Sequence, residues 1–352
     1  MVSLIKKWTT TFQIHLHKSV QYPKIEPVAD RIDRPLWSVM ITAYNRTEYI
    51  EQSILSVLAQ DFSANEMQIE VVDDCSTEYD IAAVVERVGQ GRVTYYRQPV
   101  NVGIFANWNT CIQRSQGRWI HILSDDDAVM PGFYAAYQRE LEQHQCSVAI
   151  APSVYVDECD RWTGITESLQ LNTAILENAL WLLSVQNPIR TPGIVVARRA
   201  YEQVGGFTTD LIFTPDWEMW ARLAANFPIV YLNRPYSLFR IHSSSETSRL
   251  VMTGASIVDS LEASKVIQTH FVDVAERRKV QSAVNQWLSQ ESVRLSRQLV
   301  HLRLYRSALL HALWVLKLTP SGAALRNFIK VLLKILKFEL TRKPPTPQIG
   351  AL

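Results

Sequence analysis

The stretch GRWIHILSDDDAVMP, residues 117–131, carries the most informative pattern of this sequence. An apolar run over 119–123 predicts a buried strand, and three consecutive acids, Asp125, Asp126 and Asp127, follow it directly. Adjacent carboxylates repel one another, so at the end of a buried strand they need a counter-charge. A divalent cation with oxygen ligands would provide it, whereas a single Asp is also common as a turn or cap residue. Three acids in a row favour a cation site.

Alternating strands and helices surround this stretch. Strands are expected at 37–45, 67–72, 92–96 and 118–123, and helices at 47–60, with Thr47 as N-cap, 80–88 and 103–113. Such alternation is typical of an α/β protein with a mostly parallel sheet covered on both faces. Polar clusters follow three of the strands, at 42–46, 73–76 and 124–127. Because ligands of such sheets bind at the carboxyl ends of the strands, these clusters are expected to form one site.

The pattern after Pro131 is looser and ends in helices alone. Helices are expected at 133–143, 177–185 and 217–226, and strands at 147–156, 193–197 and 229–232. Strand signals vanish beyond about Ser248. We therefore expect a basic leader at 1–35, an α/β domain at 36–248 with two halves meeting at residue 130, and a helical region at 249–352.

The composition is that of a globular protein, with 36 Lys and Arg against 34 Asp and Glu and 47% hydrophobic residues. It excludes a disordered chain, and four scattered cysteines give no support to a disulfide framework. No stretch reaches the roughly 18 to 20 apolar residues of a membrane span. Polar residues interrupt the first twenty positions, so a cleaved signal is not expected either. Reduced cytoplasm is the simplest expectation.

Seven motifs together resemble the family 2 glycosyltransferases, which transfer sugars from nucleotide-diphospho-sugars and have the GT-A fold. In chain order they are SVMITAYNR (38–46), EVVDDCST (70–77), NVGIFANWN (101–109), the stretch quoted above, GGF (205–207), DWEMW (216–220) and FRIH (239–242). The resemblance covers about residues 37–248 and implies a Rossmann-like, mixed and mostly parallel sheet flanked by helices. It also implies a metal-dependent, inverting transfer from a donor such as a UDP-sugar to a hydroxyl of a glycan or lipid-linked acceptor, in the synthesis of cell-surface polysaccharide.

Motif by motif, the resemblance implies which residues bind the nucleotide. Thr42 and Tyr44, together with Asp74, correspond to residues that hold the base, and Asp73 lies beside the ribose in this assignment. The acidic triplet corresponds to the metal-binding motif of the family, although Ser124 stands where the first acid of that motif is expected.

The same correspondence implies Asp126 as the main ligand of a divalent cation, Mn²⁺ or Mg²⁺, with Asp125 and Asp127 contacting the ribose or the donor. In FRIH, Arg240 is implied to meet the diphosphate and His242 to ligate the metal. A structural role is the alternative for a single histidine.

An acid at the start of the predicted helix 217–226 is the candidate catalytic base. A carboxylate there can take the proton of the attacking hydroxyl. The resemblance implies Asp216 for this role, although Pro215 replaces the acid that usually precedes it; by position alone, Asp216 is equally suited to cap the helix. Glu218 is implied to touch the acceptor, and Asn107 to reach the sugar.

The end of the chain carries concentrated positive charge, since residues 301–352 contain nine Lys or Arg and one acid. Over 323–340, four of these cations fall within about an 80° arc of an ideal helix, and apolar side chains fill the rest. Such a helix suits an anionic membrane, which predicts a peripheral location on the inner face of the cell membrane. A helix packed on its neighbours with solvated lysines is the alternative. No nucleic acid partner is expected, because the rest of the chain is net negative and no platform of aromatic and basic residues accompanies the tail.

Two other functions fit part of the pattern. A sugar-nucleotide nucleotidyltransferase shares an acidic metal site on a Rossmann-like sheet, but it would show a Gly-rich basic loop where this chain has AYNRTEY (43–49). A nucleotide-binding protein without turnover is favoured only by Ser124 and Pro215. Product formation, as opposed to nucleotide binding alone, distinguishes the transferase from this last alternative.

Overall fold

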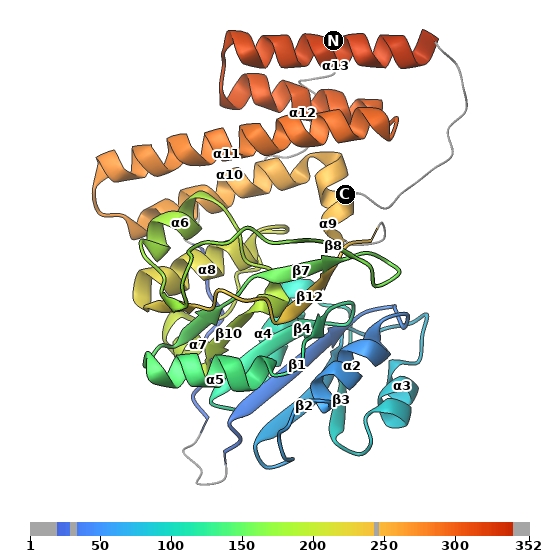
Figure 1. Cartoon of the computed structure of the whole chain (residues 1–352), viewed down its shortest axis with the longest axis vertical. Helices are drawn as coiled ribbons and strands as arrows, with labels where there is room; N and C mark the ends of the chain where they lie inside the picture. Colours follow the sequence, from blue (N-terminus) through green and yellow to red (C-terminus); the bar gives the residue numbers. More distant parts are fainter. Residues whose placement is uncertain (1–19, 29–33, 243–245, 341–352) are drawn as a thin grey trace.

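An α/β domain and a stack of C-terminal helices make up the protein (Figure 1). The structure is a computed structural model that describes residues 20–28, 34–242 and 246–340. The strands are β1 (Trp37–Ala43), β2 (Met67–Asp73), β3 (Val93–Arg97), β4 (Trp119–Ser124), β5 (Ala128–Val129), β6 (Val148–Ile150), β7 (Ser153–Val156), β8 (Trp162–Ile165), β9 (Ala174–Ile175), β10 (Ile194–Ala197), β11 (Ile229–Tyr231) and β12 (Ser237–Arg240). The helices of the α/β domain are α2 (Ile50–Leu58), α3 (Ile81–Val88), α4 (Ile104–Arg114), α5 (Phe133–Gln143), α6 (Ala179–Val185), α7 (Arg198–Val204) and α8 (Pro215–Asn226).

The main sheet is mixed and mostly parallel, which confirms the expected fold class. Its eight strands have the order β3-β2-β1-β4-β10-β6-β11-β9, in which β1 to β4 are parallel and β10 runs antiparallel to both of its neighbours. In the register of β1, Thr42 lies opposite Val72 on one side and Ser124 on the other. The carboxyl ends of β1, β2 and β4 therefore meet at one edge of the sheet.

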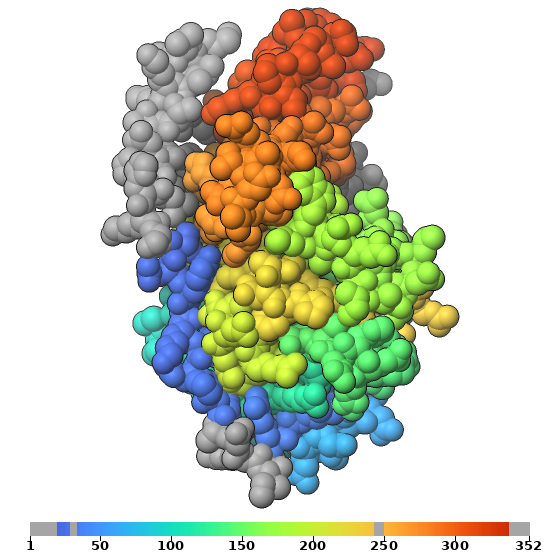
Figure 2. All heavy atoms as spheres, turned by 90° about the vertical axis from the view of Figure 1, so that its left-hand side faces the viewer, coloured from blue at the N-terminus to red at the C-terminus, as the bar shows by residue number. Residues whose placement is uncertain are grey.

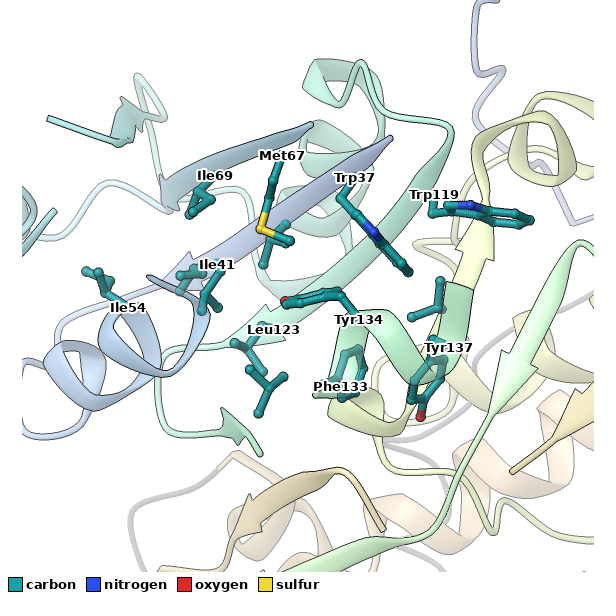
Figure 3. Packing of buried hydrophobic residues seen from close by; sticks show 14 of the residues in the cluster. Trp37, Ile41, Ile54, Met67, Ile69, Trp119, Leu123, Phe133, Tyr134 and Tyr137 are labelled. Atoms are coloured by element: carbon teal, nitrogen blue, oxygen red, sulfur yellow. The ribbon is translucent and has the colours of Figure 1, made fainter. Parts of the chain in front are cut away.

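Both faces of this sheet are buried, which explains why its strands read as nearly continuous apolar runs. Along β1, Trp37 and Ile41 point into one hydrophobic cluster and Met40 points into the other. The first cluster is shown in Figure 3, where Trp37 lies against Tyr134 of α5, with ring centroids 4.9 Å apart. The sheet is thus a rigid platform for the loops at its carboxyl edge.

A second, four-stranded sheet has the order β5-β12-β7-β8. Strand β12 pairs antiparallel with β5 and parallel with β7. Because β5 follows the acidic triplet directly and β12 leads into His242, this pairing brings the FRIH motif beside the triplet.

The remaining helices are α9 (Glu246–Thr253), α10 (Ala255–Ile267), α11 (Val274–His301), α12 (Tyr305–Leu318) and α13 (Gly322–Leu340). They form the upper part of the molecule in Figure 1, with α13 farthest from the sheet. Helices α10 and α11 share a hydrophobic cluster with α8, in which the rings of Trp217 and Trp287 lie 5.6 Å apart. Within the described ranges, no helix combines the length and apolarity needed to cross a membrane.

Three local expectations differ from the structure. The expected strand 147–156 is two strands in different sheets, β6 and β7, since Pro152 between them has no N–H for a sheet ladder. Thr47 is not an N-cap: α2 begins at Ile50, after Tyr49. The described part of the expected leader, residues 20–28, packs on the domain, where Ile25 is 1% exposed in the second cluster.

Candidate active site

The three polar clusters meet at the carboxyl edge, as their positions after parallel strands predict. The loops are tied together by backbone bonds from the N–H of Asp74 to the carbonyl of Ala43 and from the N–H of Asp125 to the carbonyl of Thr42. Thr42 is half-buried at the end of β1, and two residues later the Tyr44 side chain is 50% exposed. An exposed aromatic ring at this edge is suited to stack on a nucleotide base.

The acidic triplet lies around the guanidinium of Arg46. Arg46 forms ion pairs with Asp125 and with Asp126, the latter with 3.0 Å between Nη2 and Oδ2. Nε2 of His242 lies 2.9 Å from the same Oδ2 of Asp126 and 2.9 Å from Nη1 of Arg46. Asp127 instead accepts a bond from the backbone N–H of Arg240, at 3.0 Å, and so holds β12 in place.

The three acids have different electrostatic environments. Burial raises the pKa of Asp125 to about 7, with a further contribution from Asp126. Burial and the charge of Asp126 raise the pKa of Asp127 well above its ordinary value. For Asp126, burial alone would raise the pKa, but the hydrogen bond with His242 and the charge of Arg46 lower it below its ordinary value. Asp126 is therefore the acid of the triplet that is held as a carboxylate.

The donor atoms here fit a divalent cation in kind. Within the part of the chain that the structure describes, Oδ2 of Asp125 is buried without a hydrogen-bond partner, so it can accept a further ligand. With Oδ2 of Asp126 and Nε2 of His242 it gives two carboxylate oxygens and one imidazole nitrogen, which suit Mn²⁺ or Mg²⁺. Among the described residues these atoms are not gathered into a ready metal site. The guanidinium of Arg46 contacts all three side chains, so it would have to move if a metal ion were bound by them.

Asp73 is buried at the end of β2, and its expected place beside the ribose stays a prediction. The residue is 1% exposed. Its Oδ1 accepts from the backbone and hydroxyl of Ser76, at 2.9 and 2.6 Å, and its Oδ2 accepts from the hydroxyl of Tyr95, at 2.7 Å. The observed role of Asp73 is therefore to fix the turn after β2.

Asp74 holds the next loop. Its carboxylate accepts from the backbone N–H groups of Val102 and Gly103, at 2.8 and 2.9 Å, and from Nδ2 of Asn101, at 3.0 Å. Gly103, with φ of 86°, turns the chain into α4 in a conformation that side chains disfavour. A contact of Asp74 with the base stays a prediction, and the anchoring of this turn is its observed role.

Two further residues of the expected site have side chains that are buried and hydrogen-bonded within the protein. Arg240 is 3% exposed, and its guanidinium bonds the carbonyls of Asp126 and Asp157 and the side chains of Gln52 and Asp160. Its observed role is therefore to link β12 to α2 and to the loops after β4 and β7, and its contact with a diphosphate stays a prediction.

Asn107, expected to reach the sugar, is 2% exposed. It donates to the carbonyl of Val72 at 3.0 Å and accepts from Gln98 at 3.1 Å. Its role is to join α4 to β2.

Asp216 lies in the first turn of α8, where Thr214 and not Asp216 is the N-cap. Its Oδ1 accepts from the N–H of Trp217, at 2.7 Å, and its Oδ2 accepts from Nδ2 of Asn187, at 2.9 Å. Burial raises the pKa of Asp216 to about 6, although both of these bonds lower it. The side chain stays partly exposed. A half-buried carboxyl that titrates near neutral pH has the properties of a general base.

The loop before Asp216 is held by the C-terminal helices. Asp259 of α10, 1% exposed, accepts from the backbone N–H groups of Ile212, Phe213 and Thr214 at 2.8 to 2.9 Å. The hydroxyl of Thr214 donates to the same carboxylate at 2.6 Å. The helical region therefore helps to position the start of α8 and, with it, Asp216.

Glu218 lies in a buried ion pair, and its expected contact with the acceptor stays a prediction. It is completely buried, and its two oxygens form a bidentate pair with Arg222, at 3.0 Å each. The hydroxyl of Tyr22 donates to it at 2.9 Å, and the guanidinium of Arg222 lies over the ring of Tyr22, 3.7 Å from the ring centroid. Glu218 thus belongs to a buried ion pair that fastens the N-terminal segment to α8.

Glu218→Gln is therefore expected to destabilise the fold by about 3–5 kcal/mol, because Arg222 would remain buried without its counter-charge. Urea unfolding of the variant measures this directly. The matched change Glu51→Gln, at the exposed pair with Arg87, is expected to have little effect. A rise in the acceptor KM of Glu218→Gln with unchanged stability would support the acceptor role.

Three residues of the site were missed in the sequence. The cation Arg46 follows the first strand as the acids follow the fourth, so opposite charges at one sheet edge were a readable signal. For Asn187 and Asp259 no local signal exists, because their partners lie 29 and about 45 residues away along the chain.

Comparison with known proteins gives a consistent family. Residues 38–205 match the family model described as Glycosyl transferase family 2. An uncharacterized protein of Mycobacterium tuberculosis is 27% identical over 265 residues, which are 72% of this chain and 81% of that protein. The putative colanic acid biosynthesis glycosyl transferase WcaA of Escherichia coli is 34% identical over 116 residues, 32% of this chain and 41% of its own length. The crystal structure of S. aureus TarS 1-349 in complex with UDP-GlcNAc has a similar fold, with a TM-score of 0.57 at 15% identity over 88% of this chain and 93% of that one.

Proposed function

Because residues 38–205 form a family 2 glycosyltransferase domain and the chain is a glycosyltransferase of GT-A fold, we propose that it is metal-dependent and inverts the sugar that it transfers. The donor in this proposal is a nucleotide-diphospho-sugar, with a UDP-sugar first, since a protein of the same fold is found in complex with UDP-GlcNAc. The acceptor is a hydroxyl of a glycan or of a lipid-linked glycan. The relative named for colanic acid biosynthesis supports a place in the synthesis of cell-surface polysaccharide.

One observation carries this proposal furthest: Asp126 and His242 lie 2.9 Å apart at the carboxyl edge of the parallel strands, beside the unpartnered Oδ2 of Asp125. The two residues are 116 positions apart in the chain, and the family resemblance implies both of them as ligands of one metal. Their meeting supports a donor site of the kind that binds a metal diphosphate.

Each residue has a distinct task in the proposed reaction. Asp126 and His242 hold the cation, and Asp125 completes its ligands or contacts the ribose. Tyr44 stacks on the base, next to Thr42. A bound divalent cation supplies positive charge to the diphosphate, which becomes more negative as the bond to the sugar breaks.

Asp216 acts on the acceptor side. Its carboxylate accepts the proton of the attacking hydroxyl, while Asn187 holds the carboxylate in place through Oδ2. A single base that activates the acceptor for attack on the face opposite the leaving group leads to inversion at the anomeric carbon. We place this reaction at the inner face of the cell membrane, where a lipid-linked acceptor is presented.

A donor screen tests the proposal. Purified full-length protein is incubated with a panel of nucleotide-sugars and candidate acceptors, in Mn²⁺, Mg²⁺ or a chelator, and the nucleotides released are separated by chromatography. Release of a nucleoside diphosphate together with a glycosylated acceptor, only with metal, is the expected result. A parallel incubation with nucleoside triphosphates and sugar phosphates that releases pyrophosphate would indicate a nucleotidyltransferase, and binding without any product would indicate a protein without turnover.

The pH dependence should follow Asp216. The base must be deprotonated to act, and burial raises its pKa to about 6, so kcat at saturating donor and acceptor is expected to fall about tenfold per pH unit below 6 and to level off above about 7. Steady-state rates between pH 5 and 8 measure this profile. A kcat that does not change over this range would exclude Asp216 as the base.

A further inference from the structure

Helix α13 forms the end of the molecule that lies farthest from the main sheet. It is the outermost red helix of Figure 1, and in the view of Figure 2 the red helices again make up the top of the molecule beyond the orange α11. Phe328, Val331 and Ile335 pack into a small hydrophobic cluster with α11 and α12. One face of α13 therefore packs on α11 and α12, as expected from the alternative in which this helix lies on its neighbours.

The outward side of α13 nevertheless carries a stripe of large apolar side chains. Leu325, Ile329, Leu333 and Leu336 are 51%, 45%, 60% and 57% exposed. At 100° per residue they fall within about an 80° arc of the helix. Four exposed aliphatic side chains in one line, on the helix that closes the molecule, are unusual for a surface that faces only water.

A basic stripe lies directly beside the apolar one. Arg326, Lys330, Lys334 and Lys337 each follow one residue after a member of the apolar stripe, so they occupy the next arc of about 80°. All four are exposed. Within the described residues, Arg326, Lys330 and Lys334 make no ion pair with an acid of the protein. The outward half of the helix is thus divided between apolar and cationic side chains.

We propose that this outward face of α13 docks the protein onto an anionic lipid surface. The apolar stripe enters the boundary between head groups and acyl chains, and the basic stripe meets the acidic head groups. An apolar stripe alone would equally suit a second copy of the chain, but two such copies would bring their four-residue basic stripes together. Charge complementarity therefore favours the lipid surface. The inference goes beyond the proposed reaction, since docking needs neither donor nor acceptor.

Vesicle co-sedimentation of the full-length protein tests this docking. Vesicles of phosphatidylcholine alone are compared with vesicles of equal parts phosphatidylcholine and phosphatidylglycerol, at low and high salt. The wild type is expected to bind the anionic vesicles, to bind them less at high salt, and to leave the neutral vesicles largely unbound. A wild type that stays in solution with both compositions would overturn the proposal and would leave the transferase proposal untouched.

Two double variants assign the binding to α13. Lys330→Glu with Lys334→Glu is expected to weaken binding at least about 25-fold, from about fivefold for each cation lost. Leu333→Ser with Leu336→Ser is expected to weaken it at least tenfold without changing the thermal unfolding midpoint, because both side chains are mostly exposed. The matched control, Arg278→Glu with Lys279→Glu in the exposed first turns of α11, makes the same change of charge elsewhere and should bind as the wild type does.

If the control and the α13 charge variant lose vesicle binding equally, the binding depends on net charge alone. That result would overturn the assignment to α13. Analytical ultracentrifugation tests whether a second copy of the chain binds this face instead. A wild-type dimer that becomes monomeric in Leu333→Ser with Leu336→Ser would show that the face binds a second copy, which also contradicts the proposal.

Discussion

Asp216→Asn is expected to lower the rate of sugar transfer by about 10²–10⁴-fold while the donor still binds. The amide has nearly the shape of the carboxyl and can keep the bond from the N–H of Trp217, but it cannot accept the proton of the acceptor hydroxyl. The measurement is single-turnover transfer at saturating donor, together with the donor dissociation constant from calorimetry. The loss should appear in the rate and not in the dissociation constant.

The control for this variant is Asp210→Asn, an exposed acid in the segment that leads to α8, which is expected to keep the wild-type rate. Thermal unfolding of both variants shows whether the fold is retained. An Asp216→Asn enzyme that transfers sugar within tenfold of the wild-type rate would place the base at another residue.

Asp126→Ala is expected to weaken donor binding in Mn²⁺ at least about 100-fold, since even residues behind the metal ligands contribute about 10–100-fold to metal affinity. The reason is that Asp126 is the member of the triplet whose pKa is lowered, so it offers a charged oxygen to the cation. Binding that remains in chelator should be the same in variant and wild type. Calorimetric titration with the donor measures the dissociation constant in Mn²⁺ and in chelator.

Asp61→Ala, an exposed acid just after α2, is the matched control and should bind the donor normally. Titration of Mn²⁺ without donor distinguishes a lost metal ligand from a damaged nucleotide pocket. If the wild type binds the donor with the same affinity in Mn²⁺ and in chelator, donor binding does not depend on a metal, and this part of the proposal is wrong.

Sequence patterns predicted the parallel core of the fold well, because their physical causes are local. Apolar runs ending in polar residues, separated by amphipathic helices, specify buried strands whose carboxyl ends face one site. The pairing of Asp126 with His242 was reached by family resemblance, and β12 beside β5 explains how the fold brings it about. The helical end of the chain also follows from its 3.6-residue periodicity.

The sequence analysis did not predict the structural partners of several side chains, because these partners are remote or easily overlooked. Asp73 and Arg240 occupy motif positions, but their hydrogen bonds with Tyr95 and with Gln52 and Asp160 turn them into anchors of the loops. Such partners come together only in three dimensions. The pair of Glu218 with Arg222, in contrast, has the spacing of four residues that helical ion pairs prefer, so this structural role was readable in the sequence.

The proposed reaction combines a donor site on the sheet edge with a base on α8, and Asp259 connects the start of α8 to the C-terminal helices. If α13 docks on lipid, the same helices connect the docking face with the loop that positions Asp216. Removal of the helical region would therefore disturb the base as well as the docking face.

The anomeric configuration of the product tests the central claim most directly. The donor identified in the screen is transferred to its acceptor in Mn²⁺, and the new glycosidic bond is characterised by nuclear magnetic resonance before any later reaction. The account predicts one nucleoside diphosphate for each sugar transferred and an anomeric configuration opposite to that of the donor, since one base, Asp216, activates the acceptor for a single displacement. Retention of the donor configuration would contradict it.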